Sequence, residues 1–450
     1  MYYARWAKKK EIKDDLKKIE VNKEVSTAGV PVEYDDNKTV YIPNRDGHTL
    51  VIGATGSGKT QATILPEVKL SLLAGESIIV NDIKGEIYNI TANNFKERGY
   101  KIYTIDFDDT KLGNNWNPLT LAYQSYKENE LDRATTMLEE LGYYLFTDSK
   151  EMSDSFWTNS VIDYFTGLAL YLFENAKSEE ININSIYNLA NKLEGETERE
   201  AFLNRLNKNS TIYFNVKGTL TSPRETRGGI IATFNQKIKK YISSTNLSNM
   251  LSHSDFDLRN INKEKTAIFV ISGLTTYSNS LVPLLVNQCI EAIDIYGEKK
   301  KTNIILDEFE SMLPILNFSK IINYARSISV NITVVIKSYL DLINTYGKEN
   351  TEIIKSCFSN IIYLLSSDIY TLEEISKMCG NTEVNGKVKP LITEEELKTL
   401  KAFEAIILIP RTMPYKTTLI PDYKIEWNLV KKDLPIPKRE IKIINLYEEK

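Results

Sequence analysis

The spacing of hydrophobic positions changes twice along the chain and divides it into three parts. From residue 49 to about 121, short apolar runs alternate with longer stretches of helical spacing, and the alternation returns from 259 to about 430. Such alternation predicts an α/β protein with a mainly parallel sheet covered by helices on both faces. The predicted strands are 50–53, 77–82, 101–106, 266–271, 302–307, 331–336, 361–365 and 405–409, and the first two helices are 60–73 and 84–98.

Between 122 and 258 the strand pattern is lost and apolar residues recur at helical spacing. The helices predicted there are 131–145, 154–175, 184–193, 198–209 and 232–242. We therefore expect an all-α domain inserted into the α/β domain, and strands pairing inside 125–240 would contradict this. The remaining parts are an N-terminal segment, 1–48, and a charged tail, 431–450, whose Pro435 and Pro437 predict a loosely held end.

One motif carries most of the chemistry. The residues from Gly53 to Thr60 read Gly-Ala-Thr-Gly-Ser-Gly-Lys-Thr, between a predicted strand and a predicted helix. Glycines let backbone N–H groups turn toward a phosphate, and the helix N-terminus adds its positive dipole end. Lys59 is expected to reach the β- and γ-phosphates, and the Thr60 hydroxyl to ligate Mg²⁺. The predicted nucleotide-binding residues are Gly53, Ala54, Thr55, Gly56, Ser57, Gly58, Lys59, Thr60 and Gln61.

A second element follows the strand 302–307, which ends in Asp307 and Glu308. A strand end beside a phosphate loop is where a Mg²⁺ partner belongs, and Asp307 is predicted to hold the ion. The adjacent Glu308 is predicted to orient or deprotonate an attacking water, as a hydrolysing NTPase requires. Together the two elements predict ATP hydrolysis, with ATP and Mg²⁺ as cofactors.

Composition excludes some classes of protein. The net charge of −4 gives no global attraction to nucleic acid, so such a contact needs a local patch. Three scattered cysteines argue against a disulfide framework, and two histidines weaken any zinc-hydrolase or serine-triad hypothesis. No apolar run approaches the ~20 residues of a membrane span, and the N-terminus lacks a signal peptide. The chain as given is expected to be soluble and cytoplasmic.

Two segments are rich in basic residues. Residues 201–243 interleave aromatic residues with basic ones, against Glu225 as the one acid. The DNA-binding candidates there are Arg205, Lys208, Lys217, Arg224, Arg227, Lys237, Lys239 and Lys240. Two interpretations stand: a single-strand binding surface with stacking aromatics, or a basic helical face whose aromatics are buried. Residues 1–23 are also basic, which is typical either of a segment at a membrane surface or of a solvated amphipathic helix.

These residues resemble the type IV secretion and conjugation coupling proteins of the TraG and TraD kind, which are RecA-like DNA-translocating ATPases related to FtsK and HerA. The resemblance covers most of the chain. It is carried by Arg5–Ile12, the phosphate loop Gly53–Thr60, Asp82-Ile-Lys-Gly-Glu-Ile-Tyr88, Trp116-Asn-Pro-Leu119, Phe156-Trp157, Leu306-Asp-Glu-Phe309 and Tyr324-Ala-Arg-Ser327. Two features depart from the family. Lys337-Ser338 stands where the family usually has Gln-Ser, and the family's membrane helices have no counterpart.

The resemblance implies a RecA-like P-loop fold and a motor that pumps single-stranded DNA to a secretion channel. The partners implied are single-stranded DNA, a relaxase or relaxosome, channel subunits and further copies of the chain in a hexamer, at the cytoplasmic face of the membrane. Arg326 is the candidate for a neighbouring subunit's active site, with Arg411 in reserve, and Lys337 is a candidate phosphate contact. The alternatives are another hexameric DNA motor, such as a segregation pump, or an ATP-gated docking platform with little turnover.

Overall fold

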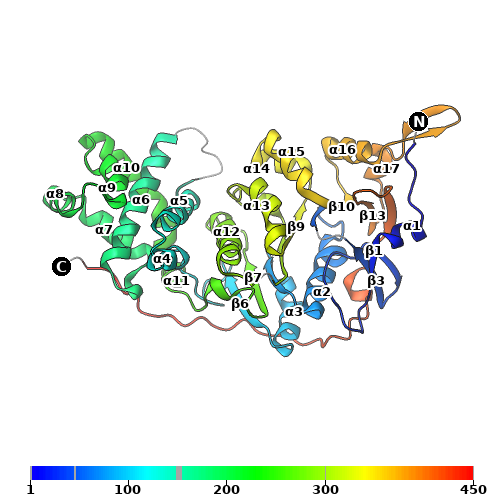
Figure 1. Ribbon diagram of the computed structural model, residues 1–450, viewed down its shortest axis with the longest axis horizontal. Helices are drawn as coiled ribbons and strands as arrows, with labels where there is room; N and C mark the ends of the chain where they lie inside the picture. The colour runs from blue at the N-terminus through cyan, green and yellow to red at the C-terminus, as the bar shows by residue number, and fades with distance from the viewer. Residues whose placement is uncertain (1–2, 45–46, 148–154, 299, 449–450) are drawn as a thin grey trace. The chain divides into compact units, whose positions relative to one another are not determined.

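The computed structural model describes residues 3–44, 47–147, 155–298 and 300–448. The chain forms two compact units. The first consists of Met1–Tyr103, Arg259–Ile271 and Ile293–Pro435, and the second of Thr104–Leu258, Ser272–Ala292 and Ile436–Lys450. Figure 1 follows the chain from blue strands through the cyan and green helices α4 to α11, which gather together, and back to yellow strands.

A large sheet organises the first unit. Among the described residues, nine strands are ordered β14-β13-β10-β4-β9-β8-β5-β7-β6. Their bounds are β4 His48–Gly53, β5 Ser77–Asn81, β6 Lys101–Asp106, β7 Thr266–Ile271, β8 Thr302–Leu306, β9 Val330–Ile336, β10 Phe358–Leu365, β13 Glu404–Leu408 and β14 Tyr415–Thr418. The pairs from β10 through β4, β9, β8 and β5 to β7 are parallel, whereas β13 and β14 are added antiparallel.

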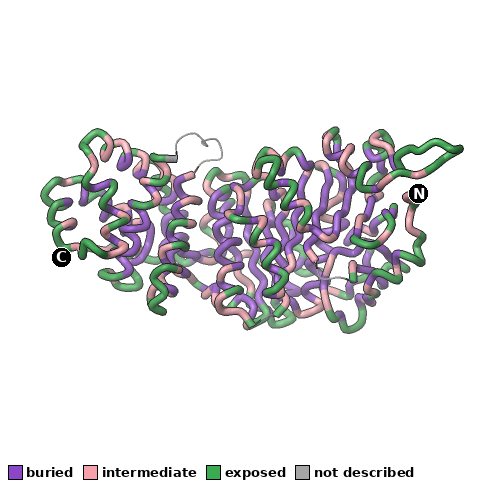
Figure 2. The backbone as a smooth tube through the Cα atoms, turned by 45° about the horizontal axis from the view of Figure 1, so that its top comes forward, coloured by how far each residue is buried: buried purple, intermediate pink, exposed green. Residues whose placement is uncertain are grey.

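The central strands are buried along their whole length. Every residue of β4, β5, β7 and β8 is buried, and the buried backbone in Figure 2 follows these strands. Continuous apolar strands are typical of a parallel sheet covered on both faces, and this part of the prediction is confirmed. The helices of this unit are α2 Leu65–Ala74, α3 Glu86–Glu97, α13 Phe318–Ala325, α14 Tyr339–Tyr346, α15 Lys348–Cys357, α16 Ile369–Cys379 and α17 Glu394–Lys398.

The N-terminal segment forms a small sheet of its own. It consists of α1 Lys9–Asp14, β1 Leu16–Glu20, β2 Glu33–Asp36 and β3 Thr39–Pro43, in the antiparallel order β1-β3-β2. Ion pairs compensate much of its positive charge: Arg5 with Glu11, Lys9 with Glu33, Lys13 and Lys18 with Asp35, and Lys23 with Glu20. These cations therefore already have carboxylate partners within the segment.

The second unit is helical between residues 120 and 250, where the described residues contain no strand. Its helices are α4 Thr120–Lys127, α5 Leu131–Phe146, α6 Ser155–Asn175, α7 Ile183–Lys192, α8 Glu196–Arg205, α9 Thr211–Leu220, α10 Arg224–Ile242, α11 Thr245–Met250 and α12 Ser278–Tyr296, which continues into the first unit. Asp154, the first residue of one predicted helix, lies outside the described residues. The unit extends beyond the predicted 122–258 to residues 104–121, 272–292 and 436–450.

The helix α10 begins at Arg224, eight residues before the predicted range 232–242, and Gly228 and Gly229 lie inside it. Glycine weakens an isolated helix, so a local pattern gives little sign of a helix across this pair. Packing explains the glycine, since a Cβ on Gly229 would lie 2.7 Å from the indole of Trp157 on α6.

The prediction of a loosely held C-terminal tail is wrong. The guanidinium of Arg439 is buried in the second unit and donates hydrogen bonds to the Asn115 and Asn249 side chains at 2.8 and 2.9 Å. It also donates to the backbone oxygens of Thr110 and Asn246 at 2.6 and 2.7 Å. Four acceptors for one buried cation hold this irregular segment in place, and a charged, proline-containing sequence gives no local sign of it.

Candidate nucleotide site

The phosphate loop joins β4 to α2 as the sequence predicted. Gly56 and Gly58 have φ angles of +81° and +89°, a region that residues with a Cβ rarely adopt. A Cβ on Gly53 would lie 2.5 Å from Ser57 Oγ, so a side chain there would collide with the loop. The loop continues into a π-helical turn, Thr60–Ile64, before α2 begins. Such wide turns often occur at functional sites.

Lys59 supplies the cation of the loop. Its Nζ donates hydrogen bonds to the backbone oxygens of Gly53 at 2.5 Å and Ala54 at 3.3 Å. Burial lowers the pKa of the Lys59 ammonium, and the nearby carboxylates, Asp307 foremost, oppose part of that shift. The loop therefore holds a desolvated positive charge close to the carboxylates that follow β8.

The two strand-end carboxylates have different surroundings. The Asn81 side chain donates to the Asp307 backbone oxygen at 3.0 Å, which ties the ends of β5 and β8 together. Burial raises the pKa of Asp307 to about 6, although Lys59 acts in the opposite direction. Asp307 and Thr60 line one cavity, and carboxylate and hydroxyl oxygens are ligands that suit Mg²⁺. The residues present therefore fit the predicted ion.

Glu308 has an unusual backbone. Its φ and ψ are 45° and 50°, in the left-handed region, which is uncommon for residues other than glycine and often marks functional sites. Its carboxylate lies 3.6 Å from Lys337 Nζ, and Lys337 also lies 3.2 Å from the Glu310 carboxylate. Burial alone lowers the pKa of Lys337, but the charges of Glu310 and Glu308 outweigh burial and the pKa is raised. Lys337 therefore lies between the predicted catalytic base, Glu308, and a second acid, Glu310.

The phosphate loop and the ends of β5 and β8 enclose a cavity of about 340 Å³. Its lining residues are Thr55, Gly56, Gly58, Lys59, Thr60, Gln61, Asp82, Ile83, Lys84, Glu86, Ile87, Asp307 and Glu308. The structure thus brings together residues from both predicted elements. Two further atoms of the loop region, Ser57 Oγ and Gln61 Oε1, are buried and have no hydrogen-bond partner among the described residues.

Three residues near this cavity received no role from the sequence. Asp82 accepts a hydrogen bond from the Tyr88 N–H at 2.8 Å, and burial raises the pKa of its carboxyl to about 6. Glu310 is the second partner of Lys337 and directly follows the strand-end motif. The Phe403 ring packs so close to Gly58 that a Cβ there would lie 2.6 Å from it. A family motif contained Asp82, but no local pattern relates Phe403 to the loop.

Residues 5–388 match a family model described as type IV secretory system conjugative DNA transfer. The chain belongs to this family. The match contains both nucleotide-site elements and the helical residues 120–250. No curated protein matches the chain at a significant level.

Solved structures show the same fold. The plasmid coupling protein TrwB in complex with ADP and Mg²⁺ has a TM-score of 0.72 at 14% identity, covering 97% of this chain and 97% of that one. VirB4 of Thermoanaerobacter pseudethanolicus has a TM-score of 0.56 at 12% identity, covering 87% of this chain and 96% of that one. The predicted RecA-like P-loop fold is confirmed. In the described part of the chain, none of the helices has the length and hydropathy of a membrane span.

Arg326 lies away from the nucleotide cavity of its own chain. It follows α13 and precedes β9, at the amino end of the parallel strands, whereas Lys59 lies beyond their carboxyl ends. Burial and, less strongly, the charge of Arg326 lower the pKa of His48, the first residue of β4, to about 4. Arg411, after β13, also lies toward this amino end because β13 runs antiparallel to β10. Neither arginine takes part in the site of its own chain.

The basic candidates for DNA lie on α8 to α10 and the loops between them. Arg205, Lys208, Lys217, Arg224 and Lys239 are exposed, and Arg227, Lys237 and Lys240 are half-buried. Phe202, Phe234 and Tyr241 are at most 1% exposed and belong to the core, so for these three rings the structure supports the second interpretation, a basic helical face with buried aromatics. Phe214, which also lies within 201–243, is 65% exposed.

Proposed function

We propose that this protein is an ATP-driven coupling protein that recruits a relaxase–DNA substrate and pumps single-stranded DNA to a type IV secretion channel. The observation that carries the proposal is the cavity in which Lys59 and the phosphate loop face Asp307 and Glu308. Family membership supplies the setting of conjugative transfer. We also propose that the protein acts at the cytoplasmic face of a membrane, with channel subunits as partners. This part rests on the family, because the basic residues of the N-terminal segment that the sequence related to a membrane surface are largely paired with acids.

In this proposal each residue has one task in hydrolysis. Loop N–H groups and Lys59 bind the phosphates of ATP and offset the charge that develops during transfer. Glu308 accepts a proton from water as the water oxygen attacks the γ-phosphorus and the bond to the bridging oxygen breaks. Thr60 and Asp307 hold Mg²⁺, which when bound neutralises phosphate charge. Lys337 holds the carboxylate of Glu308 in position through its charge.

The DNA-pumping proposal predicts that single-stranded DNA raises the steady-state rate of ATP hydrolysis. A docking platform predicts a rate near zero that DNA leaves unchanged. Replacing Arg224 and Lys239 of α10 by alanine should weaken DNA affinity at least about fivefold and reduce its salt dependence, because two phosphate contacts are lost. Fluorescence anisotropy with labelled oligonucleotides at several salt concentrations measures both effects.

The matched control for this surface replaces Lys111 and Lys177, which are exposed lysines of the second unit outside α8 to α10, by alanine. The net charge changes equally, but these lysines lie outside the proposed surface, so this variant should bind DNA as the wild type does. Equal losses in the two double variants would mean that only net charge matters and would remove the DNA surface from the proposal.

The proposal includes active sites shared between copies of the chain. Arg326 is exposed at the opposite strand ends from Lys59, so it can serve only a neighbour's site. Arg326→Ala and Lys59→Ala chains should each be inactive alone but regain phosphate release when mixed, because a Lys59→Ala subunit still offers Arg326 to the next one. Mixing Lys59→Ala with Glu308→Gln is the control, since each chain then carries a defective site. Recovery in neither mixture would exclude Arg326 as the shared residue.

A further inference from the structure

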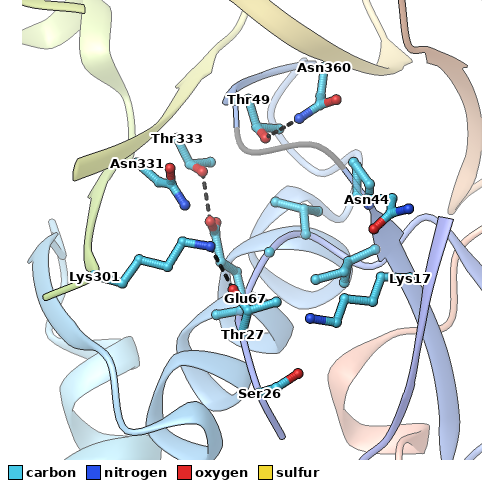
Figure 3. A pocket seen from close by; sticks show the side chains of 16 residues that line it. Lys17, Ser26, Thr27, Asn44, Thr49, Glu67, Lys301, Asn331, Thr333 and Asn360 are labelled. Carbon is cyan, nitrogen blue, oxygen red and sulfur yellow. Dashed lines mark hydrogen bonds between the residues drawn. The ribbon is translucent and has the colours of Figure 1, made fainter. Parts of the chain in front are cut away.

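A second cavity, of about 280 Å³, lies at the amino ends of the strands whose carboxyl ends carry the nucleotide site. It is lined by the beginnings of β4, β9 and β10, by α2 and by residues 26–30. Lys17 of β1, the end of β3 with Asn44, and Lys301 just before β8 complete the lining. Figure 3 shows side chains from these elements converging on it. The residues lining it are Lys17, Ser26, Thr27, Ala28, Gly29, Val30, Ile42, Pro43, Asn44, Gly47, Thr49, Glu67, Lys301, Asn331, Thr333 and Asn360.

Two deeply buried side chains in this lining have unsatisfied atoms. Glu67, which is 2% exposed, accepts a hydrogen bond from Thr333 Oγ1 at 2.8 Å through Oε1, but Oε2 has no partner among the described residues. Asn360, 3% exposed, donates to Thr49 at 3.4 Å, and its Oδ1 likewise has no partner there. A buried polar atom without a partner is destabilising, so both atoms indicate a missing polar group.

The charges of the lining favour an anion. Lys17 and Lys301 are its two cations, and Lys301 Nζ donates to Thr27 Oγ1 at 2.6 Å. Among the described residues of the lining, Glu67 is the one acid, and burial raises the pKa of its carboxyl to about 8, with the charge of nearby Glu76 adding to the effect. Burial therefore favours the protonated form of Glu67, which can donate a hydrogen bond. With Glu67 protonated, the described residues of the lining carry two positive charges and no negative one.

We infer that this cavity binds a small organic anion, a phosphate or carboxylate on a molecule no larger than a mononucleotide. Lys17 and Lys301 hold the anionic group through charge-assisted hydrogen bonds. Asn331, Asn360 and the protonated Glu67 bond the polar remainder of the molecule. Amides offer both donors and acceptors, so they accommodate a heterocycle or an amide. The inference does not rest on ATP hydrolysis, because no residue of this lining belongs to the nucleotide cavity.

Calorimetric titration of the full chain with three probes tests the inference: inorganic phosphate, cytidine monophosphate and succinate. ADP and Mg²⁺ are added first in excess so that the phosphate loop is filled. At least one probe should bind with one site per chain. Succinate binding alone would identify a carboxylate ligand, whereas phosphate and cytidine monophosphate binding would identify a phosphate ligand.

Variants locate the binding. Lys17→Ala with Lys301→Ala should weaken the probe at least about tenfold, because two charge-assisted hydrogen bonds are lost. Lys18 and Lys300 are their neighbours in sequence, and both pair with acids outside the cavity, so replacing this second pair by alanine should change affinity less than about twofold. Asn331→Leu fills the cavity while retaining the lysines and should also abolish binding.

Glu67→Gln keeps a neutral hydrogen-bonding group of the same size and should preserve the affinity. Thermal unfolding followed by circular dichroism checks that each variant is folded. Failure of all three probes to bind would overturn the inference, as would equal affinities in the two double-lysine variants. If ADP itself does not bind, the proposal of an ATPase is contradicted. Probe binding that is lost in the Lys17→Ala, Lys301→Ala variant would still support this second site.

Discussion

Lys59→Ala is expected to reduce ATP hydrolysis by at least about a thousandfold. Lys59 is the only cation within the loop motif, and it is held by the backbone oxygens of Gly53 and Ala54 against the carboxylates after β8. Removing it takes away the positive charge facing the transferred phosphate and leaves Asp307 and Glu308 without their nearest counter-charge in the loop. Phosphate release by purified protein measures the loss.

Lys59→Arg and Lys84→Ala are the control variants for Lys59→Ala. Arginine keeps the charge but not the compact ammonium that fits between the loop and the phosphates, so Lys59→Arg should also be inactive. Lys84 lines the same cavity but is exposed, and Lys84→Ala should retain activity within about tenfold. A Lys59→Ala protein with activity within tenfold of the wild type would contradict the assignment of the phosphate loop.

Glu308→Gln is expected to leave nucleotide binding intact and to slow hydrolysis by about 10²–10⁴-fold, the scale of a lost general base. Glutamine keeps the size of the side chain and its place beside Lys337, but it cannot take a proton from water. Binding is measured with a fluorescent ATP analogue and turnover by phosphate release, so that the two effects are separated. The expected outcome is an unchanged dissociation constant with a reduced rate.

Two substitutions test whether the effect belongs to Glu308. Glu310→Gln removes the other acid that contacts Lys337, and it should slow hydrolysis less because Glu310 does not line the cavity. Lys337→Gln, which gives this chain the amide usual in the family, should leave a measurable rate if Lys337 only positions Glu308. Retained turnover in Glu308→Gln would move the base elsewhere, with Glu86, which also lines the cavity, as the next candidate.

Local patterns were sufficient for most strands of the large sheet and for the nucleotide elements. The predicted strands 101–106 and 266–271 coincide with β6 and β7, and 302–307 ends one residue beyond β8. β7 and the centre of β8 are continuous apolar runs, typical of strands buried on both faces, so neighbouring residues alone decide them. The edge strand β6 is mixed, with Lys101 exposed and its last three residues buried. The phosphate loop is equally local, since its glycines are required by the backbone angles of the loop itself.

Short exposed strands left no such signal. The hairpin of β11, Asn381–Val384, and β12, Lys387–Pro390, is almost wholly exposed, and its alternation of polar residues has no buried face to mark it. Figure 2 shows this segment as mainly exposed. The strand β14 is similar, because it adds to the edge of a sheet that other strands have already formed. Tertiary pairing decides such strands.

The sequence by itself determined the phosphate loop, the pair Asp307 and Glu308 and the helical character of residues 120–250, because each depends on residues adjacent in the chain. Only the tertiary structure decided which distant residues meet. It placed Lys337 between Glu308 and Glu310, Phe403 against Gly58, Arg439 in a buried cluster and Arg326 at the far strand ends. It also decided between the two interpretations of the aromatics in 201–243, because Phe202, Phe234 and Tyr241 are core residues. The physical reason is that burial and contact between remote segments depend on packing, which the spacing of neighbouring residues does not specify.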